Sequence, residues 1–158
     1  MTTAELLQKL DFEGNENEFL AKEDTGLEMD IRTVIFPDFG INGNTGEGNF
    51  FFHMLSEPGE EEAGRIFVCR YTLCIDAKDD IILPLCAESV TENYEYPVGT
   101  LGFDPEDNAV IYTLQTPLPD DLSDDEMLKQ AELSVMISLR AARDLAVKYA
   151  SLANGGGI

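Results

Sequence analysis

Positive charge is scarce in this sequence. Only 10 Lys and Arg stand against 31 Asp and Glu, which gives a formal net charge of −21. Such a field repels phosphate backbones and anionic lipid headgroups, so the composition argues against nucleic-acid binding and against docking on a membrane. It favours a protein partner of basic character. An alternative stays open, in which the acids serve only solubility.

Histidine is nearly absent, since His53 is the only one and lies in the apolar run 50–55. A Ser/His/Asp set built around it would need partners from positions that no motif marks. We therefore expect a strand histidine with a local hydrogen bond, in preference to a catalytic or metal-ligating one.

Cysteine is also sparse, and the CxxC spacing of zinc and redox sites is missing. Cys69, Cys74 and Cys86 are an odd number and lie within apolar stretches. This pattern is typical of buried free thiols in a reducing compartment.

Long apolar runs are missing as well. No segment reaches the roughly 18 apolar residues of a membrane span, and residues 1–10 lack the basic and apolar regions of a secretory signal. We expect no membrane association and a cytoplasmic location.

The apolar content that is present suffices for one core. Hydrophobic residues make up 44% of the chain, with nine Phe and five Tyr. A chain of roughly 150 residues buries about two thirds of its unfolded surface in one domain. We expect residues 1–158 to form a single domain with a flexible loop at 40–48 and a tail at 154–158.

Hydrophobic periodicity predicts an α+β fold. The expected architecture is a short N-terminal helix, an antiparallel sheet of about five to six strands, a middle helix, and a long C-terminal helix packed on the sheet. Thr3 caps the first helix, and a hairpin turns at residues 24–26. Pro84 places the start of the middle helix at about residue 84. The expected strands are 18–22, 27–36, 49–56, 65–75, 98–103 and 109–116, and the later helices are 84–93 and 124–153.

One strand has a clear inner face. In the run 65–75 every second side chain, from Phe67 through Tyr71, is apolar, so this side is expected to face the core. The complete apolar set is Phe67, Cys69, Tyr71, Leu73 and Ile75.

The last helix carries more apolar surface than one packed face requires. Ser123 and Glu126 form a capping box at its start. The segment 133–139 (LSVMISL) is apolar nearly all round. Either it is clamped on two sides within the fold, or part of it is a subunit contact. For the second case, a homodimer, the candidate interface residues are Val135, Met136 and Leu139.

Two segments imitate ligand sites without their defining residues. The Gly-rich loop 40–48 has no GK[ST], and an apolar strand follows it where a phosphate site needs a helix. The acidic stretch 104–108 lacks the glycine and distal glutamate of an EF-hand. We therefore predict no metal, no cofactor and no catalytic residues.

The second half of the chain resembles the YbjN-like proteins, which share the fold of class I type III secretion chaperones. The resemblance is carried by residues 93–104 (NYEYPVGTLGFD), by residues 109–112 (AVIY) and by the capped last helix. It implies a compact, often dimeric and acidic α+β domain whose secretion relatives hold extended segments of partner proteins. It carries over no catalytic residue.

These observations predict a non-enzymatic, chaperone-like protein-binding module that holds segments of a partner protein, basic or extended. Extended segments bind along strand edges and in apolar pockets. The candidate lining residues are Val34, Phe36, Phe50 and Phe52. Two alternatives stay open: an acidic mimic of nucleic acid that sequesters a basic protein, and a small-ligand binder or enzyme with an unrecognised site.

Overall fold

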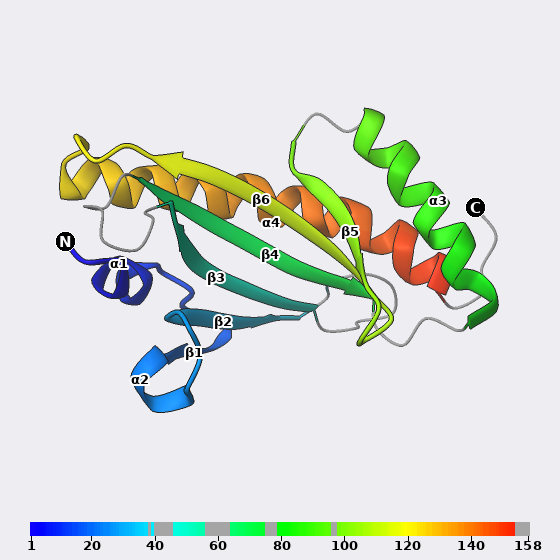
Figure 1. The fold of residues 1–158 in the computed structure, drawn as a ribbon, viewed down its shortest axis with the longest axis horizontal. Helices are drawn as coiled ribbons and strands as arrows, with labels where there is room; N and C mark the ends of the chain where they lie inside the picture. Colours follow the sequence, from blue (N-terminus) through cyan, green and yellow to red (C-terminus); the bar gives the residue numbers. More distant parts are fainter. Residues whose placement is uncertain (38, 40–45, 56–63, 75–78, 96–97, 154–158) are drawn as a thin grey trace.

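The computed structural model describes residues 1–37, 39, 46–55, 64–74, 79–95 and 98–153. Four helices and six strands are found in this part of the chain (Figure 1). In order they are α1 (Thr3–Lys9), β1 (Glu16–Leu20), α2 (Lys22–Thr25), β2 (Ile31–Phe36), β3 (Gly46–Met54), β4 (Arg65–Cys74), α3 (Asp79–Glu95), β5 (Thr100–Asp104), β6 (Ala109–Leu118) and α4 (Asp124–Ala153).

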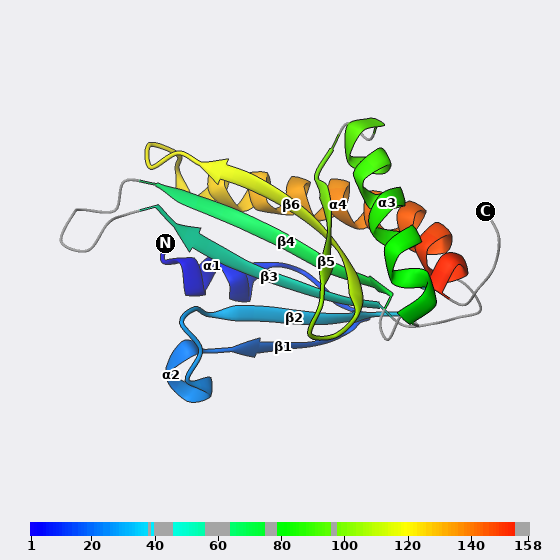
Figure 2. The same ribbon diagram turned by 45° about the vertical axis from the view of Figure 1, so that its right-hand side comes forward.

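The strands form one antiparallel sheet in the order β1-β2-β3-β4-β6-β5. Helix α4 runs along the central strands β4 and β6, and α3 lies beside the C-terminal part of α4 and against β5 (Figures 1 and 2). The expected α+β architecture is therefore confirmed. Within the described residues, the opposite face of the sheet has no helix on it.

The core lies between this sheet and α4. On β4 the side chains of Phe67, Cys69, Tyr71 and Leu73 are all buried, which confirms the predicted inner face. Tyr71 is central, because its ring contacts that of Phe50 and its hydroxyl lies 2.7 Å from Ser138 Oγ on α4. This contact gives the hydroxyl of the fully buried Tyr71 the hydrogen-bond partner that a buried polar group requires.

The N-terminal helix is held by Arg32 of β2. The Arg32 guanidinium donates to the carbonyl oxygens of Leu7 and Gln8 at 2.8 and 3.2 Å, where α1 leaves backbone acceptors free. Partial burial lowers the pKa of Arg32. The cap at the other end of α1 is Thr2, one residue before the predicted one, in a reciprocal capping box with Glu5.

Two predicted boundaries are wrong. Residues 24–26 do not form a hairpin turn, because a single helical turn, α2, ends there with Gly26 in the left-handed region, and β2 begins only at Ile31. Helix α3 begins at Asp79, so Pro84 lies in its second turn. Proline there removes one backbone hydrogen bond without ending the helix.

The predicted loop 40–48 is shorter than expected. Gly46 and Gly48 belong to β3, where the rings of Phe39 and Phe36 pack against them so closely that a side chain would collide. Residues 40–45, and the predicted tail 154–158, lie outside the described residues.

The β5–β6 hairpin and α4 follow the prediction closely. Asn108 adopts the left-handed region in the turn after β5, and Asp104 accepts a hydrogen bond from the Glu106 backbone. Helix α4 has the predicted bounds, and the Ser123 side chain accepts from the backbone N–H of Glu126 at 3.2 Å.

Candidate functional site

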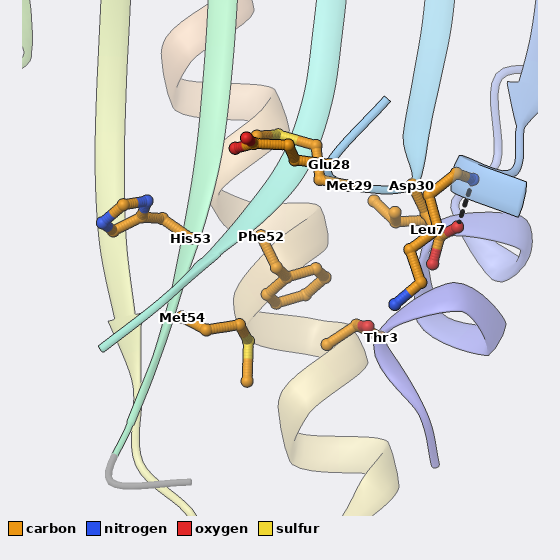
Figure 3. A pocket seen from close by; sticks show the side chains of 9 residues that line it. Thr3, Leu7, Glu28, Met29, Asp30, Phe52, His53 and Met54 are labelled. Carbon is orange, nitrogen blue, oxygen red and sulfur yellow. Dashed lines mark hydrogen bonds between the residues drawn. The ribbon is translucent and has the colours of Figure 1, made fainter. Parts of the chain in front are cut away.

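The only histidine lies at the edge of an open hollow beside α1 (Figure 3). Phe52 lies at the centre of the hollow, and the His53 ring points away from Asp30. The Asp30 carboxylate already accepts a 2.9 Å hydrogen bond from the Lys22 backbone at the start of α2. The hollow has a volume of about 230 Å³ and is lined by Thr3, Leu7, Lys22, Glu28, Met29, Asp30, Phe52, His53 and Met54.

The groups in this hollow do not form a reactive set. The His53 side chain is exposed on β3 and makes no hydrogen bond to the described residues, so the expected local hydrogen bond is missing. The Cys69 thiol is buried beneath α4 and not in the hollow. This burial raises its pKa to about 12. Among the described residues, no three His, Cys, Asp or Glu side chains are grouped so as to hold a metal ion.

The four residues predicted to line a partner groove lie in the core. Val34 and Phe50 have no exposed surface, Phe36 is 1% exposed and Phe52 is 7% exposed. Phe52 reaches the hollow beside α1. The prediction was wrong because these side chains are on the face of β2 and β3 that α1 and Phe12 cover.

A second hollow lies on the sheet face that carries no helix. Arg70 extends across this face, with its guanidinium 5.1 Å from the centre of the Phe51 ring. This contact shields Phe51, and the hollow holds one cation together with the Asp104 carboxylate among hydroxyl and apolar side chains. The hollow has a volume of about 430 Å³ and is lined by Arg70, Thr100, Leu101, Gly102, Phe103, Asp104, Pro105, Ile111 and Thr113.

Helix α3 turns an uncharged apolar stripe away from the protein. Leu83, Val90 and Tyr94 are 80, 71 and 91% exposed, and Ala87 between them is exposed too. Their spacing of four, three and four residues places all four on one side of a helix. We call this set the α3 stripe. Large apolar side chains so exposed and so aligned mark an interaction surface.

The opposite side of α3 is fixed to the protein by three kinds of contact. Leu85 and Ser89 are buried. The Asn93 amide group bonds both backbone groups of Leu101 on β5, at 2.9 and 2.6 Å. This contact gives a structural role to the asparagine in the motif that carries the family resemblance.

An ion pair completes the attachment of α3. The Lys148 ammonium of α4 donates to Glu88 at 2.5 Å and to Glu92 at 3.0 Å. These hydrogen bonds, that to Glu88 above all, raise the pKa of Lys148 against the opposing effect of partial burial. Lys148, the cation that contacts the inner side of α3, is thus already paired with two carboxylates.

Helix α4 divides the three predicted interface residues between its two sides. Val135 and Leu139 are half-buried against the core, whereas Met136 is 62% exposed. Leu133, Ile137 and Val147 are exposed with Met136. The inner face of α4 buries two serines, Ser134 and Ser138.

Comparisons with protein-family models, with curated proteins and with solved structures give no match to this chain. In the part of the chain that the structure describes, no helix combines the length and the apolar character needed to cross a membrane.

Sequence reasoning missed the α3 stripe although its signal was present. Leu83, Ala87, Val90 and Tyr94 follow a regular heptad-like spacing that can be read from the sequence. The spacing shows that the side chains share a face, but it does not show whether that face is covered.

Proposed function

We propose that this protein is a non-enzymatic, chaperone-like binding module that holds a segment of a partner protein. The observation that carries the proposal is the α3 stripe, where three large apolar side chains are 71 to 91% exposed on an otherwise strongly acidic chain. Contiguous exposed apolar surface is costly in water and favours association. The resemblance to secretion chaperones points in the same direction.

The charges around the stripe favour a partner segment that is both apolar and basic. Helix α3 has no basic residue of its own. The exposed side chains of Asp80 and Glu95 lie toward its two ends. A partner with apolar residues at its centre and Lys or Arg at its flanks matches this distribution. A cytoplasmic location is part of the same proposal.

The test uses a defined peptide in place of an unknown partner. A fluorescent peptide of alternating Leu and Lys is titrated with the protein, and its anisotropy is measured. Val90→Ser and Tyr94→Ser together should weaken binding by about tenfold or more, because they remove apolar surface from the contact without adding a carboxylate that would attract the Lys side chains. Leu55→Ser is the matched control, since Leu55 is 55% exposed but lies outside α3.

The outcomes separate the alternatives. Equal binding by the parent chain and the α3 variant would contradict the proposal, as would binding that Leu55→Ser weakens as strongly. A peptide in which every Lys is replaced by Ser, and an acidic Leu/Glu peptide, should bind weakly. Binding that collapses with added salt and that the α3 substitutions leave unchanged would instead describe a nucleic-acid mimic.

A further inference from the structure

The strand edge beside the α3 stripe is closed by a side chain. Strand β5 is at the edge of the sheet and lies next to α3 (Figure 1). The Leu101 N–H donates to the Asn93 Oδ1 atom at 2.6 Å, and the Leu101 carbonyl oxygen accepts from Asn93 Nδ2 at 2.9 Å. Asn93 thus makes the two hydrogen bonds that an added strand would make at Leu101. A partner segment on α3 is left without these backbone groups.

This closure disfavours an extended partner on the stripe. The backbone groups inside α3 bond within the helix, apart from the one bond that Pro84 removes. An extended segment laid across the stripe would bury N–H and C=O groups with no partner on the α3 side, which is unfavourable. A helical segment bonds its own backbone groups and presents only side chains to the contact.

The spacing of the stripe also matches a helix better than a strand. Its members recur at intervals of four, three and four residues, which is the seam of two helices packed side by side. Along the α3 axis, successive members lie about 4.5 to 6 Å apart. Side chains on one face of an extended segment lie about 7 Å apart, so they would fall out of step with the stripe. The small Ala87 side chain, between Leu83 and Val90, leaves room for one large side chain of a partner helix.

Acidic residues are found only at the two ends of the stripe. Asp80 lies three residues before the stripe begins and continues its spacing, and Glu95 directly follows its last residue. Both side chains are exposed, and neither makes an ion pair with the described residues. Beside the middle of the stripe lie Pro84, Cys86 and Thr91, none of which is acidic or basic. The complementary segment is therefore apolar in the middle and basic at both ends.

We infer that the partner segment held on the α3 stripe is an amphipathic helix with Lys or Arg at both ends. The stripe runs from Leu83 to Tyr94, about 16 Å along the helix, so a partner helix of about 12 residues covers it. A helix of this length is only marginally stable alone in water, so it folds on the stripe. This conformation differs from the extended segment that the family resemblance implies.

The inference rests on the proposed function, because it specifies the conformation of the segment that the α3 stripe holds. The two are nevertheless separable by experiment. The proposed function requires that a basic and apolar peptide binds through the stripe in any conformation, whereas the inference requires that the bound peptide is a helix.

The first experiment compares two peptides of identical composition. The alternating Leu/Lys peptide places its Leu side chains on one face of a strand. The second, the helical-period peptide, has the same residues with Lys at both ends and Leu at i, i+3, i+4 and i+7, on one face of a helix. In anisotropy titrations with the full chain, the helical-period peptide should bind at least about tenfold more tightly. Val90→Ser with Tyr94→Ser should remove this difference, and Leu55→Ser should preserve it.

The second experiment measures the conformation of the bound peptide. The circular dichroism of the helical-period peptide mixed with the protein should exceed the sum of the separate spectra by a gain of helix. Replacing the central solvent-facing Lys of this peptide by proline should weaken binding by about tenfold or more, because proline breaks the helix. Replacing the same Lys by alanine, which favours a helix, is the matched control and should change the affinity by less than about threefold.

The outcomes separate the inference from the proposed function. If the alternating peptide binds as tightly as the helical-period peptide, and both lose affinity in the α3 variant, the inference is wrong and the proposed function stands. If the helical-period peptide binds without a gain of helix, or tolerates proline as well as alanine, the inference is wrong too. If neither peptide loses affinity in the α3 variant, both are overturned.

Discussion

Helices α3 and α4 each bury one side and expose an apolar other side, but they differ in how firmly they are held and in charge. Among the described residues, α4 buries nine side chains and α3 buries two. The exposed side of α3 carries no charge at its centre, whereas that of α4 carries unpaired cations.

This difference separates two kinds of interaction surface. A helix with many buried contacts holds its outer side chains in fixed positions, which suits a contact of defined geometry. A helix with few buried contacts opens locally at lower free energy, which suits a surface that adapts to a partner segment. The comparison predicts that changes beneath α3 loosen that helix without unfolding the rest.

The largest effect is expected at Leu85, the main apolar anchor of α3. Leu85 is 1% exposed, so Leu85→Ala should lower the free energy of unfolding by about 2 to 5 kcal/mol. Leu83→Ala, on the same helix but 80% exposed, should change it by less than about 0.5 kcal/mol.

Urea unfolding followed by circular dichroism measures both variants, and hydrogen exchange locates the loss. Exchange should rise in α3 and stay slow in α4. Equal effects of the two substitutions would show that α3 is not anchored through Leu85.

A smaller effect is expected from the ion pair between the helices. Lys148→Met should cost about 1 kcal/mol, because it leaves the half-buried carboxylates of Glu88 and Glu92 without their cation. Since the pKa of Lys148 is raised in the folded state, its contribution is complete below the unfolded pKa of about 10.4 and is lost as pH rises beyond it.

Thermal unfolding at a series of pH values tests this prediction. The difference between parent and Lys148→Met should be constant from pH 7 to about pH 10 and should then shrink. Lys129→Met is the matched control, because Lys129 makes no ion pair with the described residues. A difference that grows above pH 10 would contradict the assignment.

The smallest expected effect is a difference between the rates at which two thiols react with a labelling reagent. Cys86 is half-buried on α3, whereas Cys69 has no exposed surface beneath α4 and its pKa is raised to about 12 by burial. In a Cys74→Ser background at pH 8, Cys86 should react quickly with a thiol reagent and Cys69 only as the protein unfolds. Mass spectrometry of the labelled peptides follows both. Equal rates would mean that α4 opens as easily as α3.

The fold could be predicted wherever a local sequence pattern is compatible with only one local structure. Alternating residues defined the inner face of β4, and the Ser123 cap defined the start of α4. The start of α3 could not be predicted, because proline is tolerated in the second turn once other contacts hold the helix. The Phe residues of β3 were misassigned because apolar side chains on a strand serve equally well in a core and in a groove.

The candidate surfaces were predictable only in part. The sequence predicted an excess of apolar residues at 133–139 and included Met136 among the interface candidates. It named Val135 and Leu139 as interface candidates as well, and these two side chains are half-buried against the core.

The sequence by itself determined the α+β class, the acidic character, the bounds of the last helix and the residues that share a face on each element, because these depend on composition, capping and periodicity along the chain. Only the tertiary structure decided which faces are covered. Burial depends on which elements pack against each other, and the same periodic stripe is core on α4 and exposed surface on α3.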